Sequence, residues 1–364
     1  MQDKKTKVCL IGTSLSGGGA NKNQALISKM FHQHGFETHN VIVVNSISFD
    51  YGGELFNLGL HKSNGILNRI KRFYLLRNYI KNHKFDFIID FRDRSKVLQE
   101  FFVLNFIYTV PYIPTIRSFY LEYYIPKNKL LGSLIFKNAY GIVTVSKALE
   151  VKVKEDYNYK NVQTILNPLD LEQINRLSKE SISIDGNFVI AAGRMDSDEH
   201  LKQFDRLIEI YSKSKLPEWN IKLVLLGDGT DKSRLEILAN EYNVSENVLF
   251  EGFQKNPYAY FSKAKYLVLS SKNEGFPTVL NEALACGTPV VSFDCESGPN
   301  EIIDHKVNGF LVENQNFEAL KNAMERMILD KDLYSNCKKN AQNKKDLHSF
   351  EKTMEHWKTF LKVE

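Results

Sequence analysis

Short apolar runs alternate with helix-length amphipathic segments throughout the first half of the chain. The runs that predict strands are residues 8–12, 38–44, 85–90, 112–116, 141–145 and 162–166, and the helical patterns cover residues 20–34, 62–84 and 95–108. Strands separated by helix-length segments favour right-handed βαβ units, and therefore a parallel sheet. This half is thus predicted to be a doubly wound α/β domain.

The same alternation restarts after Asn167-Pro168 and a polar stretch at residues 178–186. Further strands are predicted at residues 188–192, 221–226, 248–250, 266–269, 289–292 and 309–312, and three helical patterns follow from Phe317. A length of 364 residues is about twice that of a usual domain. We expect one domain at residues 1–167 and a second at 168–345, with a C-terminal helix, about residues 346–364, that crosses back onto the first.

The strongest chemical signal follows the predicted strand at residues 266–269. A turn made of Glu274, Gly275, Phe276, Pro277 and Thr278 leads into a helix that carries Glu282, and Ala-Cys-Gly-Thr-Pro-Val-Val closes the segment. Proline suits the first helical turn, and the free amides of a helix N-terminus attract anions. A carboxylate in that turn is suited to accept hydrogen bonds from sugar hydroxyls beside a bound diphosphate.

This segment resembles the Glu-x7-Glu motif of family-4 retaining glycosyltransferases with the GT-B fold. The resemblance implies an α/β fold of two doubly wound Rossmann-like domains that face an interdomain cleft. It also implies that Glu274 contacts the donor sugar and that Glu282 holds the ribose hydroxyls. The alternative is a helix cap beside a solvated glutamate.

The family also pairs an arginine with a lysine to hold the donor diphosphate. Gly193-Arg194 closes one predicted strand, and Lys202 opens the following helix after a loop about three residues longer than the commonest form. Two cations there would neutralise charge on the leaving group. The loop contains Asp196 and Asp198, which resemble a metal-binding Asp-x-Asp, but a polar loop is favoured, and no catalytic metal or other cofactor is expected.

Other positions match the family around the nucleotide. Gly17, Gly18 and Gly19 lie between the first strand and helix, where the resemblance implies that they reach the donor diphosphate; a plain tight turn is the alternative. Gly227 follows one strand, and Phe253 follows another near the expected position of the base. Residues 294–303 look like the variant found in enzymes that use UDP-sugars in bacterial surface-glycan assembly.

The clearest departure from the family is on the acceptor side. Many members place a histidine where this chain has Arg117, and Arg92 and Asp93 follow the preceding strand. Arginine is not a base at neutral pH, but it can clamp a phosphate or carboxylate. These three residues are candidates for acceptor binding, with a structural ion pair as the alternative. The histidines, among them His39 and His83, are expected to form no cluster and are assigned no role.

Charge is unevenly distributed along the chain. Residues 1–165 contain 23 basic and 12 acidic residues, whereas the remainder contains 25 basic and 31 acidic residues. The amphipathic stretch Lys62–Lys84 is especially basic, which predicts either a solvated helix packed on the sheet or a surface attracted to anionic lipid. No recognised nucleic-acid-binding motif accompanies the charge. Unpaired cysteines and the lack of a long apolar run favour a cytoplasmic protein, peripheral on the inner face of the membrane.

The function predicted from these motifs is transfer of a hexose or N-acetylhexosamine from a UDP-sugar to a hydroxyl of a glycan or lipid-linked glycan, with retention of configuration. Two alternatives remain open. One is a UDP-sugar epimerase of the same fold, and the other is a non-catalytic partner subunit of a glycosyltransferase.

Overall fold

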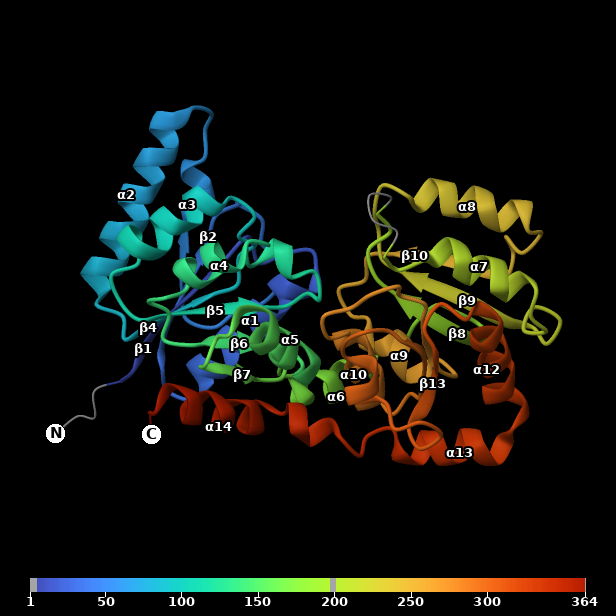
Figure 1. Ribbon diagram of the computed structural model, residues 1–364. Helices are drawn as coiled ribbons and strands as arrows, with labels where there is room; N and C mark the ends of the chain where they lie inside the picture. The colour runs from blue at the N-terminus through green and yellow to red at the C-terminus, as the bar shows by residue number, and fades with distance from the viewer. Residues whose placement is uncertain (1–4, 197–200, 364) are drawn as a thin grey trace. The chain divides into compact units, whose positions relative to one another are not determined.

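The computed structural model describes residues 5–196 and 201–363, which fold into two compact units (Figure 1). Unit 1 comprises Met1–Pro168 and His348–Glu364, and unit 2 comprises Leu169–Leu347. The Asp198 of the possible Asp-x-Asp pair lies outside the described residues. Among the described helices, none is long and apolar enough to cross a bilayer.

Unit 1 is built on a parallel sheet of seven strands in the order β3-β2-β1-β4-β5-β6-β7. The strands are β1 (Lys7–Gly12), β2 (Glu37–Ile42), β3 (Glu54–Asn57), β4 (Phe87–Asp90), β5 (Tyr112–Ile116), β6 (Ile142–Thr144) and β7 (Val162–Thr164). The helices are α1 (Gly19–Gln33), η1 (Leu58–His61), α2 (Ile66–His83), α3 (Val97–Phe102), η2 (Val103–Ile107), η3 (Leu121–Tyr123), α4 (Lys129–Ile135), α5 (Lys147–Tyr157) and α14 (Phe350–Leu361).

Helix α14 completes the core of unit 1, although it lies at the far end of the sequence (Figure 1). Its Trp357 ring meets the Phe31 ring of α1 edge to face, with centroids 5.6 Å apart. The Tyr140 hydroxyl donates to the carbonyl of Phe360 at 3.2 Å. Trp357 is 1% exposed, so this helix fills space against β1 and α1 that would otherwise leave apolar side chains in water.

Unit 2 is a parallel sheet of six strands in the order β10-β9-β8-β11-β12-β13. The strands are β8 (Asn187–Ala192), β9 (Ile221–Leu226), β10 (Val248–Gly252), β11 (Leu267–Leu269), β12 (Val290–Asp294) and β13 (Gly309–Glu313). The helices are α6 (Leu171–Leu177), α7 (Phe204–Ser212), α8 (Lys232–Glu241), α9 (Tyr258–Lys263), α10 (Thr278–Ala285), α11 (Pro299–Ile302), α12 (Phe317–Leu329), α13 (Lys331–Asn340) and η4 (Lys345–His348), which runs to the border of the unit.

In both units the strand order reverses direction at one point. In unit 1 the reversal lies between β1 and β4, and in unit 2 it lies between β8 and β11. Doubly wound sheets bind ligands at the carboxyl ends of the strands beside such a reversal. The segments that follow β8 and β11 are therefore the first place to look for a site in unit 2.

Three elements differ from the sequence prediction. Strand β3 was not predicted, because its four residues, Glu54–Asn57, form a partly exposed edge without a clear apolar pattern. The helix predicted at residues 95–108 is α3 followed by a π-helical segment, η2. The basic helix begins only at Ile66, because Gly65 has a φ of 101°, outside the helical range.

Candidate active site

Two glycines bring the ends of β8 and β9 together. Gly227 has a φ of 132°, and a Cβ atom on it would lie 1.9 Å from the carbonyl oxygen of Gly193. The Gly193 amide donates to the Leu226 carbonyl at 2.9 Å, and the Met195 amide donates to the Asp228 carbonyl at 3.0 Å. A larger residue at position 227 would push these strand ends apart. Glycine at position 227 therefore allows the close backbone packing that fixes the conformation around Arg194.

Lys202 and Glu274, which are 72 residues apart in sequence, form an ion pair beside this strand end. The Lys202 Nζ atom lies 2.5 Å from Glu274 Oε1, and the side chains are 26% and 14% exposed. Gly193 makes room for the lysine, since a Cβ atom there would lie 3.0 Å from Lys202 Cε. The cation and the carboxylate assigned to the donor are therefore next to each other at the carboxyl ends of β8 and β11.

Hydrogen bonds anchor the lysine to the end of β11. The Ser270 hydroxyl donates to the Lys202 carbonyl at 2.7 Å, and the Lys272 amide donates to the Leu201 carbonyl at 2.8 Å. The backbone of Lys202 is thus fixed two residues before α7 begins at Phe204. The position of Lys202 after the long preceding loop is thus defined by contacts with the end of β11.

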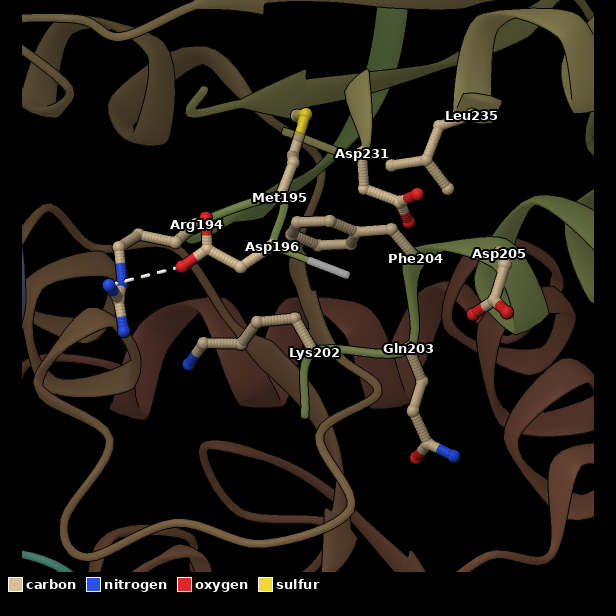
Figure 2. Close-up of a pocket in the computed structure, with 9 residues that line it drawn as sticks. All are labelled: Arg194, Met195, Asp196, Lys202, Gln203, Phe204, Asp205, Asp231 and Leu235. Atoms are coloured by element: carbon tan, nitrogen blue, oxygen red, sulfur yellow. Dashed lines mark ion pairs between the residues drawn. The ribbon is translucent and has the colours of Figure 1, made fainter. Parts of the chain in front are cut away.

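Arg194 is the more exposed of the two cations. Its side chain is 72% exposed and pairs with Asp196, with Arg194 Nη1 3.0 Å from Asp196 Oδ2. In Figure 2 the Arg194 and Lys202 side chains extend toward the same end of a small pocket. The residues lining this pocket are Arg194, Met195, Asp196, Lys202, Gln203, Phe204, Asp205, Asp231 and Leu235. Because Asp196 pairs with an arginine, it acts here as a charge partner within the loop.

The turn that carries Glu274 is held from the next loop of unit 2. The Ser297 hydroxyl donates to the Gly275 carbonyl at 2.7 Å. Gly298 has a φ of 96°, and a Cβ atom there would lie 2.5 Å from Pro277 Cδ. Phe276 is buried at 7% exposure. Pro277 is the residue that caps α10, one position before the first helical turn in which it was predicted.

Glu282 lies on α10, which begins at Thr278, and it is buried at 5% exposure. Two asparagines next to the glutamates were not assigned a role from the sequence. Asn273 Oδ1 and Asn281 Nδ2 are buried and have no hydrogen-bond partner in the described part of the chain. Buried polar atoms without partners carry a free-energy cost, which a bound ligand or water can remove. Each asparagine directly precedes one of the two glutamates in the sequence, and from that position they could have been predicted as site residues.

The remaining donor candidates lie at strand ends in both units. Gly252, the last residue of β10, has a φ of 68°, its carbonyl accepts the Gly227 amide at 2.8 Å, and the following Phe253 is 51% exposed. In unit 1, Gly17 has a φ of 78° with open space around it, Gly18 caps α1 without a side-chain hydrogen bond, and Gly19 begins that helix. The glycine loop of unit 1 and Phe253 of unit 2 thus each follow a strand, which is where ligand-binding loops of doubly wound sheets lie.

The acceptor candidates are more tightly built into unit 1 than the sequence indicates. Arg92 Nη2 lies 2.8 Å from Asp90 Oδ2 and 3.0 Å from Glu100 Oε2, and it also donates to the Tyr108 hydroxyl at 3.1 Å. Although burial opposes ionisation of Asp90, Arg92 and Arg94 hold its pKa below the ordinary value. These contacts favour the structural ion-pair interpretation for Arg92.

Arg94, which received no role from the sequence, is 1% exposed and donates to the carbonyls of Asp90 and Thr115. Asp93 is exposed between the two arginines. Arg117 donates to the Asn167 side-chain oxygen, and its guanidinium lies 5.1 Å from the centre of the Phe91 ring. Burial lowers the pKa of Arg117 to about 10, which leaves it charged at neutral pH. Asp93 and Arg117 remain the better candidates to meet an acceptor.

The expectation that the histidines form no cluster is wrong. His39 and His83 lie together with Glu54 in unit 1, because β2, β3 and the end of α2 meet there. Among residues 5–196 and 201–363, this is the one group of three or more histidine, cysteine or carboxylate side chains close enough to hold a metal ion. The group is not part of the strand ends that carry Arg194, Lys202 and Glu274.

Most of unit 2 matches a known protein family. Residues 174–344 match the family of glycosyl transferases group 1. An uncharacterized glycosyltransferase of Haemophilus influenzae is 30% identical over 222 residues, which are 60% of this chain and 60% of that protein. A Campylobacter jejuni enzyme, N-acetylgalactosamine-N,N'-diacetylbacillosaminyl-diphospho-undecaprenol 4-alpha-N-acetylgalactosaminyltransferase, is 33% identical over 219 residues, 60% of this chain and 58% of that protein. The chain thus matches about three fifths of the length of these relatives.

The fold comparison extends over almost the whole chain. The structure of Anabaena HepE in complex with UDP and glucose superposes with a TM-score of 0.79 at 18% identity, covering 98% of this chain and 99% of that one. At this identity the similarity establishes the fold, which is the GT-B fold of two Rossmann-like domains. Residues 174–344 are therefore similar to the group 1 glycosyl transferases, within a chain that has the GT-B fold.

Proposed function

We propose that this chain transfers a hexose or N-acetylhexosamine from a UDP-sugar to a hydroxyl of a glycan or lipid-linked glycan, with retention of configuration, in bacterial surface-polysaccharide biosynthesis. The observation that carries the proposal is the convergence of Arg194, Lys202 and Glu274 at the carboxyl ends of β8 and β11. Two cations and a carboxylate at a strand-order reversal suit a sugar diphosphate.

Each residue has a distinct part in the proposed reaction. The bond between the anomeric carbon and the β-phosphate oxygen breaks, and Arg194 and Lys202 stabilise the charge on the departing UDP. The acceptor oxygen attacks from the same face and transfers its proton to a β-phosphate oxygen. Glu274 orients the sugar through its hydroxyls, and Glu282 holds the ribose. This sequence requires no protein nucleophile and no metal.

The identity of the donor is supported by the relatives. HepE was solved with UDP and glucose, and the Campylobacter enzyme is named for transfer of N-acetylgalactosamine to a diphospho-undecaprenol-linked sugar. Residues 294–298 lead into the short helix α11, and Ser297 and Gly298 fix the Glu274 turn. We therefore propose a donor that carries uridine diphosphate and an acceptor that is linked to a lipid diphosphate.

A surface of unit 1, here called the α2 surface, supports a location at the membrane. Its apolar members Leu60, Ile66, Leu67, Ile70 and Tyr74 are 58–79% exposed, and its basic members Lys62, Arg69 and Lys71 are also exposed. Of the helix α2, only Leu76 and Ile80 are buried. The first turns of α2 extend beyond the sheet of unit 1 (Figure 1). The exposed apolar side chains of α2 are therefore not packed on the sheet, in contrast to those of Leu76 and Ile80.

Neighbouring elements continue the exposed apolar character. Leu98 of α3 is 87% exposed, Phe106 of η2 is 55% exposed and Leu130 of α4 is 78% exposed. Apolar side chains interspersed with lysine and arginine are typical of surfaces that lie in the interface of an anionic bilayer. We therefore place the protein on the inner face of the cytoplasmic membrane, with unit 1 at the lipid and no role for nucleic acid.

The proposed reaction is tested by UDP release. The purified chain is mixed with UDP-glucose, UDP-galactose and their N-acetylated forms, with GDP- and ADP-sugars as controls, each with and without undecaprenyl-diphosphate-linked acceptors. We expect UDP to form with one UDP-sugar and to rise with an acceptor, and NMR of the product to show the anomeric configuration of the donor.

Three other results would contradict the proposal. Interconversion of UDP-sugars without an acceptor would indicate an epimerase. Binding of no donor and release of no UDP would indicate a non-catalytic partner. Inverted configuration in the product would refute the same-face mechanism. Glu274→Gln serves as the inactive control in each assay, since it removes the carboxylate but keeps the side-chain volume.

A further inference from the structure

His39, Glu54 and His83 come from three separate elements of unit 1. His39 lies in β2, Glu54 begins β3, and His83 ends α2. The parallel register pairs His39 with Glu54 across β2 and β3. Possible ligand atoms of the three side chains all lie within 4.8 Å of one another. Two imidazoles and a carboxylate are the donor set that zinc and similar metals prefer.

The far sides of the two imidazoles differ in their contacts. His83 Nδ1 lies 2.8 Å from the Tyr79 carbonyl oxygen, which only accepts, so this nitrogen carries the proton and Nε2 keeps its lone pair. His39 Nε2 lies 3.5 Å from the Glu37 carboxylate, which is itself paired with Lys7 at 2.7 Å. A metal-binding histidine usually donates its other ring N–H to a carboxylate or carbonyl. His83 has such a partner, whereas His39 Nε2 makes no hydrogen bond among the residues that the structure describes and only has the Glu37 carboxylate nearby.

The nitrogen of His39 that faces the cluster is Nδ1. It lies 3.6 Å from Glu54 Oε2 and accepts a hydrogen bond from the Tyr79 hydroxyl at 2.7 Å. A metal ion would take the Nδ1 lone pair in place of the Tyr79 hydrogen bond. Glu54 is 73% exposed, which gives a metal ion a path from solvent.

We propose that His39 Nδ1, His83 Nε2 and the Glu54 carboxylate bind one divalent transition metal ion of the Zn²⁺ type. In a tetrahedral zinc site the ligand atoms lie roughly 3.3 Å apart, given bonds of about 2.0–2.1 Å. The exposed Glu54 side chain would move inward by about an ångström, the Tyr79 hydroxyl would turn away from His39 Nδ1, and a water would complete the coordination. The ion would join the end of α2 to β2 and β3.

The position of this site separates it from the proposed chemistry. Glu37 and Glu54 begin their strands, so the cluster lies at the amino ends of β2 and β3. The donor candidates of unit 1 follow the carboxyl end of β1, at the opposite edge of the same sheet. The role of the ion is therefore structural, and the inference holds whether or not the chain transfers sugars.

Metal binding is tested on the full chain after treatment with EDTA and its removal. Titration with Zn²⁺ in a calorimeter should show one site per chain that is lost in His83→Gln and weakened at least about tenfold in Glu54→Gln. Zn²⁺ should raise the melting temperature of the wild type and not of His83→Gln. Co²⁺ should give the visible absorption bands of a tetrahedral site. His356→Gln, which changes an exposed histidine of α14, should behave as the wild type.

Several outcomes would overturn the inference. They are absence of stoichiometric Zn²⁺ binding by the wild type, or wild-type affinity in either His83→Gln or Glu54→Gln. Glu54→Gln changes an exposed residue and is expected to fold as the wild type, which circular dichroism of the metal-free proteins checks. Since the readouts are binding and stability, failure of this site leaves the proposed sugar transfer untouched.

Discussion

The ammonium group of Lys202 and the carboxylate of Glu274 are 2.5 Å apart at the carboxyl ends of β8 and β11. The pair joins the residue assigned to the donor diphosphate with the residue assigned to the donor sugar. A bound diphosphate would pair with Lys202, and sugar hydroxyls would donate hydrogen bonds to Glu274. A bound donor would therefore replace the contact between these two residues with two contacts to the ligand. Both side chains are mostly covered, which strengthens their charge interactions relative to pairs in open solvent.

Lys202→Met should weaken UDP binding by about 1.5–3 kcal/mol and lower turnover, because a charge-assisted contact to the diphosphate is lost. Lys213→Met is the matched control, since Lys213 forms a similar pair with Glu209, at 2.7 Å, on the exposed face of α7. Calorimetry with UDP and steady-state kinetics measure both effects. Equal UDP affinity in Lys202→Met and the wild type would remove Lys202 from the diphosphate site.

The two glutamates of the motif should separate in their effects. Glu274→Gln should lower kcat far more than UDP affinity, because this carboxylate lies in the turn and is proposed to orient the sugar. Glu282→Ala should mainly weaken UDP binding, by about 1.5–3 kcal/mol, because it removes an acceptor for the ribose hydroxyls. Kinetics and UDP calorimetry on both variants give the comparison. Matching losses of UDP affinity would contradict the division of roles.

UDP binding and turnover should survive chelation by EDTA. The motive is that the candidate metal group of the described chain lies in unit 1 and not beside Arg194 and Lys202 in unit 2. The same treatment should lower the melting temperature if the ion at His39 is removed. Activity that EDTA abolishes and Mn²⁺ restores would refute the metal-free mechanism and return attention to Asp196 and Asp198.

The α2 surface should bind anionic vesicles, and salt should weaken that binding, since charges beyond about 8 Å are screened at physiological ionic strength. Co-sedimentation with phosphatidylglycerol vesicles at low and high salt measures it. Lys62/Arg69/Lys71→Glu should abolish binding, and Ile66/Leu67/Ile70→Ser should weaken it even at low salt. Arg72 and Arg77 are poorer choices, because they donate to the carbonyls of Val43 and Phe106 and hold α2 in place.

The control for vesicle binding is Lys255/Lys331/Lys339→Glu, an equal change of charge at exposed positions of unit 2. It should leave vesicle binding close to that of the wild type. If the wild type ignores anionic vesicles at low salt, or if both triple variants bind alike, the α2 surface is only a solvated face.

Arg92→Ala should destabilise unit 1 by about 3–5 kcal/mol, because it leaves the buried carboxylate of Glu100 without its cation and leaves Asp90 with Arg94 alone. Urea unfolding measures this loss. Arg117→Ala should instead raise the KM for an anionic acceptor more than the KM for the donor. An Arg92→Ala protein of normal stability with a raised acceptor KM would reinstate Arg92 as a binding residue.

The sequence was most informative where neighbouring residues act together. The turn and helix from Glu274 to Glu282, and the strand ending at Gly193, each have a local pattern that survives folding. The pairing of Lys202 with Glu274 required the topology, since the lysine precedes α7 and the glutamate follows β11. For Arg92 the sequence was misleading. Its charge suggested a binding role, but in the structure the guanidinium is paired with Asp90 and Glu100.

The cluster of His39, Glu54 and His83 was not predictable from spacing. Its members are brought together by the pairing of β2 with β3, and β3 is an edge strand without an apolar pattern of its own. Without that strand, nothing in the sequence places Glu54 beside His39. The exposure of Ile66 and Leu67 was also not predictable, because periodicity indicates that a helix has an apolar face but not whether another element covers that face.

The contribution of α14 to unit 1 sets an order for folding during synthesis. Domains usually fold as they leave the ribosome, the N-terminal one first. Here the core of unit 1 is incomplete until Trp357 can reach Phe31, whereas unit 2 is one continuous stretch, Leu169–Leu347. Unit 2 can therefore reach its final packing while unit 1 still lacks a helix. During translation, the apolar side chains of unit 1 that α14 covers therefore stay exposed until that helix has been made.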